Sequence, residues 1–375
     1  MAIALGLLLA IHGLIHLLGF VHAFKLAEIP QFTGATLVAL PEVWIRAIGL
    51  TWMLTCAVLV TAGALLLLRA GSWWLFAAAG LSLSQLLVIY AWPDAKAGTL
   101  ANLVLVIPAI VAWADAGFQR ATDAQVHALF SRSSQANTPA VTREAIAPLP
   151  APVRRWLEGS GIVGRRVPRT VRLRQRGLMR LSAEQAEIPA TAEQYFRVDE
   201  PEFIWRVRVR VMKFLPVAGR DSYVGGRGRM SIALASLIPV VEVADEKIDQ
   251  GALLRFLGET VWFPAAALSP YIHWEPLDER SARATMTHNG VSGAAVFSFD
   301  EHGRFIRLTA DRYFGGGADA KLERWEIEAQ EWRTMAGCQV PVRGEVRWKL
   351  AKGDFTFYRW ELTELEYDLA VPSRG

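Results

Sequence analysis

Hydrophobic residues form long unbroken segments in the first part of the chain and alternate with polar residues in the rest. Four apolar segments each have about the length, roughly 17–25 residues, that a helix needs to cross a bilayer. They cover approximately residues 2–24, 45–68, 72–92 and 98–114. Trp73 and Trp74 lie at the start of the third segment, and Tyr90 and Trp92 lie at its other end, as is typical of interfacial aromatic belts. The pattern predicts a four-helix transmembrane domain over residues 1–118.

From residue 169 onward the pattern has a period of two, which is typical of strands with one buried face. In the stretch FIWRVRVRVMKF (203–214), Trp205 and Val207 share one face, whereas Arg206 and Arg208 share the other. Further alternating stretches follow, separated by turn signals such as HNGVSG and FGGGADA. We predict about ten strands, mostly joined by hairpins and therefore antiparallel.

Two helices are expected to accompany the strands. Val153, Trp156 and Leu157 are spaced at i, i+3 and i+4, and Gly159 provides a stop, so this segment predicts an amphipathic helix. The apolar stretch 249–268 predicts a second helix, buried against the sheet.

The predicted fold class is membrane α plus β. The four-helix transmembrane bundle is followed by a Pro- and Ala-rich linker over 119–148. A curved, half-barrel-like antiparallel β-sheet domain with one or two packed helices then covers 149–375. Such a sheet can enclose a hydrophobic cavity.

Composition supports the membrane assignment and argues against one class of partner. Hydrophobic residues make up 52% of the chain and the mean hydropathy is +0.24, which is typical of an integral membrane protein. The net charge of +4 comes from well-mixed signs in the polar half, without the basic stripe that a nucleic-acid partner requires. Cys56 lies in an apolar segment and Cys338 near the far end, so we expect no disulfide.

Charges near the apolar segments bear on orientation. The first segment lacks a basic n-region and is too long for a signal peptide. Lys25 follows this otherwise uncharged segment and favours a cytoplasmic first loop, although the loops on the two sides carry equal numbers of basic residues. We therefore expect an integral protein of a bacterial inner (cell) membrane, with the C-terminal domain on the extracytoplasmic side.

Three histidines occur in the first apolar segment. His12 and His16 are 40° apart on a helix and share a face, whereas His22 lies near the interface. The other three segments contain no histidine, so a bis-histidine haem within one chain is excluded. A metal site with Cys56, Met53, Gln85 or Asn102, a proton relay, and a substrate or lipid contact remain alternatives. The structural interpretation is that His12 and His16 form hydrogen bonds with Gln85, Ser82, Thr99 or Asn102.

The polar half contains none of the strong catalytic motifs, such as a nucleophile elbow, a zincin helix or a P-loop. His273 and Glu275 share a strand face, and with Glu259 they make the one constellation that suggests an acid/base or metal group. The competing interpretation is that Glu259 anchors a buried helix through an arginine or backbone groups. We predict no metal and no cofactor.

Aromatic and charged residues suggest where an apolar ligand would bind. The candidate ligand-binding residues are Trp205, Trp262, Phe263, Arg220, Asp221 and Arg312. Arg312 is expected to pair with Asp221 or Glu259 across the sheet. A separate set of alternating arginines, on 170–181 and 203–214, would either contact anionic lipid headgroups or pair with acidic residues of adjacent strands.

Several motifs together resemble a family of bacterial membrane-anchored proteins that is classed as a domain of unknown function. They are GLIHLLGFVHAF, AWPDAKAGTLANLV, LPAPVRRWLEGSGIVG, GRDSYVGGRGRM and GETVWFPAAAL with HWEPLD. The resemblance is most specific over about 149–367 and implies no catalytic residues. The strand–helix pattern is also similar to the half-barrels of Lol-type lipoprotein carriers, although a lipobox cysteine and a cleavable signal are not expected here.

The function that we predict is non-enzymatic: the β domain binds or handles a lipid or another apolar ligand at the membrane. The expected partners are membrane lipids and an apolar small molecule. Two alternatives remain: a membrane-bound enzyme or metal site that uses His273, Glu259 and Glu275, and a structural or sensory module that recruits a partner.

Overall fold

The computed structural model describes residues 2–30, 33–133, 138–211 and 215–369. The chain divides into two compact units, Met1–Phe118 and Gln119–Gly375. Each unit is described by itself.

The first unit is helical. It contains α1 (Ala2–Ile15), α2 (Leu17–Ala23), α3 (Glu42–Leu67), α4 (Trp73–Tyr90), α5 (Trp92–Ala95) and the first part of α6 (Ala97–Ser131). Four helical segments are long and apolar enough to cross a membrane: Ala2–Ala23, Glu42–Leu67, Trp73–Tyr90 and Ala97–Ser131. Much of their outer surface consists of exposed leucine and isoleucine, which suits a hydrocarbon environment better than water.

Small residues bring α1 and α3 close together. A Cβ atom on Gly63 would lie 2.6 Å from the carbonyl oxygen of Gly6, so a larger residue cannot occupy this position without moving the helices apart. Glycines at such crossings are typical of helix pairs in membranes. Leu9, Leu59 and Leu81 form the core beside this contact.

The second unit is a single curved sheet with helices. Its helical elements are the rest of α6, α7 (Arg143–Ile146), α8 (Ala151–Gly159), α9 (Glu246–Glu259) and the 3-10 turns η1 (Thr260–Trp262) and η2 (Pro264–Leu268). The first six strands are β1 (Thr170–Met179), β2 (Ile188–Arg197), β3 (Glu202–Val211), β4 (Leu215–Val224), β5 (Arg227–Leu234) and β6 (Ile238–Val243). The others are β7 (Ile272–Pro276), β8 (Ser281–His288), β9 (Val291–Phe299), β10 (Phe305–Phe314), β11 (Lys321–Met335), β12 (Cys338–Leu350) and β13 (Gly353–Tyr367).

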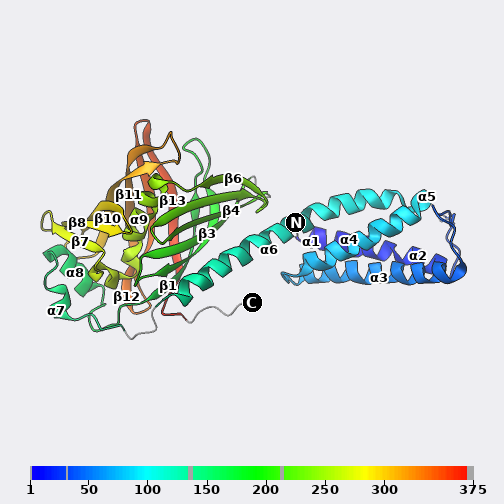
Figure 1. Cartoon of the computed structure of the whole chain (residues 1–375), viewed down its shortest axis with the longest axis horizontal. Helices are drawn as coiled ribbons and strands as arrows, with labels where there is room; N and C mark the ends of the chain where they lie inside the picture. The colour runs from blue at the N-terminus through cyan, green and yellow to red at the C-terminus, as the bar shows by residue number, and fades with distance from the viewer. Residues whose placement is uncertain (1, 31–32, 134–137, 212–214, 370–375) are drawn as a thin grey trace. The chain divides into compact units, whose positions relative to one another are not determined.

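The described strands form one antiparallel sheet in the order β6-β5-β4-β3-β2-β1-β13-β12-β11-β10-β9-β8-β7. Two meanders therefore meet where β1 pairs with β13, and β6 and β7 are the two edges. The chain between these edge strands forms α9, η1 and η2. Helix α9 packs against β4 and β5 near one edge and against β8, β9 and β10 near the other, so it fills the open side of the curled sheet (Figure 1).

The outer face of the sheet carries cross-strand ion pairs. Arg172 lies 2.7 Å from Glu193 and 2.8 Å from Glu366, and Arg176 lies 2.7 Å from Glu361. Arg206 donates to Glu193 in the same way. The expected pairing of these arginines with acidic residues of adjacent strands is thereby confirmed.

The structure differs from the sequence-based expectation at two places. Residues 119–131, within the predicted linker, continue α6 as a helix, because Val126, Leu129 and Phe130 form an apolar stripe that packs on Tyr195 and Ile204. The described part of the chain holds thirteen strands rather than about ten. The additional strands lie mainly between residues 188 and 243.

Candidate functional site

The concave face of the sheet and α9 enclose a cavity of about 370 Å³. This volume lies at the lower end of the range of small-molecule sites, about 300–1,000 Å³. The lining is mainly aromatic and aliphatic, and its tryptophans are Trp205, Trp262, Trp325, Trp348 and Trp360. The cavity is therefore of a size and character that suit an apolar ligand.

Strand alternation and glycines on α9 determine the shape of the cavity. Leu308, Ala310 and Arg312 occupy alternate positions of β10, and they point toward the helix. Opposite them, Gly251 and Gly258 are seven residues apart and share one face of α9. A Cβ atom on Gly251 would lie 3.1 Å from Nε of Arg312, so the glycine leaves room for this side chain.

Arg255 of α9 is the centre of a hydrogen-bonded network in the cavity wall. Its guanidinium donates to Glu259 at 2.9 Å, to Asp221 at 2.8 Å and to the side-chain oxygen of Gln194 at 3.2 Å. Gln194 in turn donates to the second carboxylate oxygen of Glu259 at 2.6 Å. The guanidinium also lies 4.4 Å from the ring centroid of Trp205. Both carboxylates of this network are therefore engaged by Arg255.

Arg312 enters the cavity from β10 and lies against aromatic rings; the expected pairing with Asp221 or Glu259 is wrong, because both carboxylates bind Arg255. Its guanidinium carbon is 4.9 Å from the ring centroid of Trp325 and 5.6 Å from that of Trp348. Burial and the positive charge of Arg255 lower the pKa of Arg312 to about 10. Burial also raises the pKa values of Asp221 and Glu259, against the opposing effect of Arg255. Arg312 nevertheless remains charged at neutral pH.

Four of the six candidate ligand-binding residues line the cavity, namely Trp205, Trp262, Asp221 and Arg312. Phe263 does not, because it packs into the core at 4.8 Å from the ring of Phe196. Arg220 lies on the opposite face of β4 from Asp221, and its guanidinium donates to Thr122 of α6 at 3.4 Å. Adjacent strand residues point to opposite faces, so the two neighbours cannot both enter the cavity.

The candidate trio His273, Glu259 and Glu275 does not form one group. Glu259 is buried in the cavity wall, whereas His273 and Glu275 are exposed on the edge strand β7. Among the described residues, no cluster of three His, Cys, Asp or Glu side chains could hold a metal ion. Glu259 instead accepts hydrogen bonds from Arg255 of its own helix and from Gln194 of β2, and the second bond ties the end of α9 to the sheet.

In the helical unit the polar residues bind one another. His12 Nε2 lies 2.8 Å from Asn102 Oδ1 and 3.3 Å from Ser84 Oγ, and Asn102 donates to Gln85 at 3.0 Å. His16 differs from the expectation, because its Nδ1 lies 2.8 Å from the carbonyl oxygen of His12, within its own helical segment. His16 lies between α1 and α2, where the backbone keeps helical dihedral angles.

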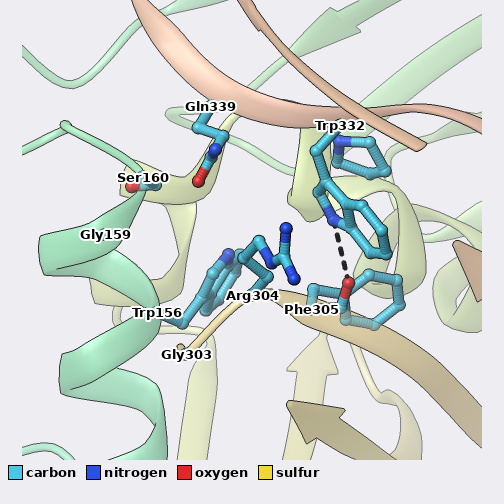
Figure 2. A pocket seen from close by; sticks show the side chains of 9 residues that line it. Trp156, Gly159, Ser160, Gly303, Arg304, Phe305, Trp332 and Gln339 are labelled. Atoms are coloured by element: carbon cyan, nitrogen blue, oxygen red, sulfur yellow. Dashed lines mark hydrogen bonds between the residues drawn. The ribbon is translucent and has the colours of Figure 1, made fainter. Parts of the chain in front are cut away.

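Two other hollows in the β unit are less suited to an apolar ligand. The one in Figure 2, between α8, the turn that carries Arg304 before β10, and Trp332 of β11, has a volume of about 10 Å³, roughly enough for one water molecule. There Trp332 donates to the carbonyl oxygen of Phe305 at 3.1 Å. The other hollow is an open surface depression whose charged lining side chains are Arg227, Arg229, Asp245 and Asp249. Of these, Arg227 and Asp249 pair with each other at 2.9 Å.

Sequence reasoning missed Arg255, Gln194 and the aromatic wall of Trp325 and Trp348. The spacing of Arg255 and Glu259, four residues apart on a predicted helix, was a visible signal for their pairing. Gln194 lies on β2, which the alternation did not reveal, so nothing in the sequence indicated its role.

The fold and the cavity define a class of protein: a half-barrel with an apolar, partly charged cavity, in a chain that also carries four apolar helices. The chain belongs to a family of unknown function (DUF6544), whose model matches residues 139–360. The expected resemblance to such a family is thereby confirmed for this region. No curated protein matches the chain.

Two solved structures are similar to part of the chain. One is a DUF1329 family protein from Desulfovibrio piger, with 10% identity and a TM-score of 0.33, covering 54% of this chain and 87% of the other. The second is a domain from Vibrio parahaemolyticus named for outer membrane lipoprotein sorting, with 8% identity, a TM-score of 0.33 and the same coverage. Likenesses this distant say nothing about ligand or activity.

Proposed function

We propose that this protein is an integral membrane protein whose β unit binds a lipid or another apolar ligand without transforming it. The observation that carries the proposal is the cavity of about 370 Å³ under α9, with its tryptophan-rich wall. Filling such a space with an apolar chain removes aromatic and aliphatic surface from water, which stabilises the complex.

Residues 1–118 serve, in this proposal, as a four-span anchor in a bacterial cell membrane. The ligand-binding unit lies on the extracytoplasmic side, as the position of Lys25 favours. Fusing alkaline phosphatase or a green fluorescent protein to the C-terminus tests this orientation. Activity of the phosphatase fusion alone supports it, and fluorescence of the other fusion alone contradicts it.

The cavity itself is tested by filling it. Val346 lies half-buried on β12 and lines the cavity, so Val346→Trp places a large ring in the space that the ligand would occupy. The matched control is Val240→Trp, because Val240 is 64% exposed on β6 and does not line the cavity.

Native mass spectrometry of the full chain released from lipid nanodiscs gives the readout. We expect wild type and Val240→Trp to retain one additional apolar molecule that Val346→Trp has lost. Equal ligand content in all three proteins would contradict the proposal. Met230→Trp, a second lining position on β5, covers the case in which Val346→Trp fails to fold.

A further inference from the structure

We infer that the ligand of this cavity is a single-chain amphiphile with an anionic head, a carboxylate or a phosphate monoester, and that Arg312 binds this head. The inference rests on the proposed function and adds the chemical class of the ligand. It follows from the charges of the lining, from the contacts of Arg312 and from buried donors in the same wall.

The lining carries an excess of positive charge. Its basic side chains are Arg229, Lys247, Arg255 and Arg312, and its acidic side chains are Asp221 and Glu259. Both acids are hydrogen-bonded to Arg255, Lys247 donates to the carbonyl oxygen of Gly317 at 2.8 Å, and the exposed Arg229 lies 3.8 Å from Glu242. Arg312 is therefore the lining cation with neither an acidic partner nor an acceptor among the described residues. A cationic ligand is therefore disfavoured, whereas an anion would balance the charge.

Arg312 differs from the other buried cation in having no hydrogen-bond acceptor. Among the residues that the structure describes, no side chain or carbonyl accepts a hydrogen bond from Arg312, and its buried Nε is unsatisfied. Its described contacts are the rings of Trp325 and Trp348, with Asp221 and Glu259 acting on it only through their charge. A buried guanidinium without an acceptor is costly, and a carboxylate or phosphate can satisfy it with two parallel hydrogen bonds.

Further donors in the same wall also lack partners. Trp205 Nε1, Trp325 Nε1 and the Tyr358 hydroxyl are buried and form no hydrogen bond with any described group. All three residues line the cavity, and burial raises the pKa of Tyr358, so its hydroxyl keeps its proton. Indole N–H groups can only donate, so the polar group that this wall lacks is an acceptor.

The size of the cavity favours one alkyl chain. About 370 Å³ lies close to the lower limit of small-molecule sites, and two acyl chains with a full headgroup would need far more space. The aromatic wall of Trp262, Trp360 and Phe355 offers the apolar surface along which such a chain would lie.

Two sources supply this chemistry: free fatty acids with a carboxylate, and single-chain lipids with a phosphate. The probes are dodecanoate, dodecyl phosphate and the uncharged dodecanol, each radiolabelled. Binding is measured on the full chain in phosphatidylcholine nanodiscs, with empty nanodiscs subtracted for partitioning.

We expect wild type to bind the anions at least about tenfold more tightly than dodecanol, as charge-assisted hydrogen bonds allow. Arg312→Gln should abolish this preference while leaving dodecanol binding within about twofold, because the apolar contacts remain. Arg312→Lys should restore part of the preference. The matched control is Arg307→Gln, because Arg307 is an exposed residue of the same strand, 4.0 Å from Glu328, and it should behave as wild type.

The anion that binds more tightly indicates where the natural ligand comes from. A preference for dodecanoate indicates fatty acids, and a preference for dodecyl phosphate indicates single-chain phospholipids. Equal binding of dodecanol and both anions, unchanged in Arg312→Gln, would overturn the inference but leave the proposed function standing. Absence of binding by all three probes, in wild type as in Val346→Trp, would overturn both.

Discussion

The two units of this chain treat buried polar groups in different ways. In the helical unit, His12, Ser84, Gln85 and Asn102 satisfy one another across α1, α4 and α6, and among the described buried side-chain atoms of this unit His16 Nε2 alone has no partner. In the β unit, Arg255 is paired with two carboxylates, but Arg312 and several donors nearby are not. A closed network is typical of a structural role, whereas unsatisfied donors around a cavity indicate a place for a ligand.

The two units also expose different types of residue on their outer surfaces. The helices expose leucine and isoleucine, and the sheet exposes arginine and glutamate in cross-strand pairs. The outer surface of the helical unit therefore suits an apolar solvent, whereas the β unit has an apolar core under a charged outer face. Four substitutions or conditions sharpen this comparison, from the largest expected effect to the smallest.

Arg255→Met should have the largest effect on the β unit. It leaves Asp221 and Glu259 buried beside each other without their hydrogen-bonded cation, and breaking a buried pair in this way costs about 3–5 kcal/mol. Hydrogen exchange of the α9 and β4 amides measures the loss locally. Adding Glu259→Gln and Asp221→Asn should recover part of the stability, and protection unchanged in the single variant would show that the network is not structural.

Acid should weaken the β unit through Glu193. Burial opposes ionisation of Glu193, but hydrogen bonds and charges from Arg206 and Arg172 prevail and lower its pKa to about 2. A carboxyl whose pKa is lower in the folded state contributes stability above its unfolded pKa, and this stability is lost as the pH falls toward 2. The contribution is at most about 3 kcal/mol. Urea midpoints between pH 5 and pH 2.5 should therefore fall more steeply for wild type than for Glu193→Gln, and parallel curves would contradict this.

Asn102→Leu should destabilise the helical unit by about 0.6–2 kcal/mol, the range found for hydrogen bonds between helices in membranes. It removes the amide that accepts from Ser84 and donates to Gln85. Ser82→Ala is the matched control, because the Ser82 hydroxyl donates to the carbonyl oxygen of Ala78 in the same helix. Thermal unfolding in detergent compares the stability of the two variants. Equal losses of stability would mean that the network between helices is not what stabilises the unit.

Arg176→Gln should have the smallest effect. Arg176 pairs with Glu361 on the outer face, but its side chain is 66% exposed, and such pairs contribute little in water. We expect no measurable change in the melting temperature, at low or high salt. A clear loss at low salt would show that the outer ion pairs act as a network.

Sequence alone predicted the two-part division into apolar helices and an antiparallel sheet, because both patterns are long and regular. It missed the hairpin of β5 and β6, whose turn places Ala235 and Ser236 at positive φ (53° and 56°) without the glycine or asparagine that normally marks such a turn. It also missed how α6 continues to Ser131, because a Pro- and Ala-rich stretch follows directly.

The candidate site was only partly accessible from sequence. Period two assigns Asp221 and Arg220 to opposite faces of β4, but which face is concave depends on the curvature of thirteen described strands. The meeting of Arg312 with Gly251 depends on the path of α9 between the edge strands. Neither contact has a local signature in the sequence.

The central claim is that an alkyl chain occupies the cavity under α9, and photolabelling tests it most directly. A fatty acid with a diazirine near its chain end is added to membranes that contain the full chain, irradiated, and its adducts are mapped by peptide mass spectrometry. The account predicts adducts on cavity residues such as Trp262, Phe355 and Trp360, displaced by excess dodecanoate and absent in Val346→Trp. Adducts confined to residues 1–118, with none in the cavity, would contradict it.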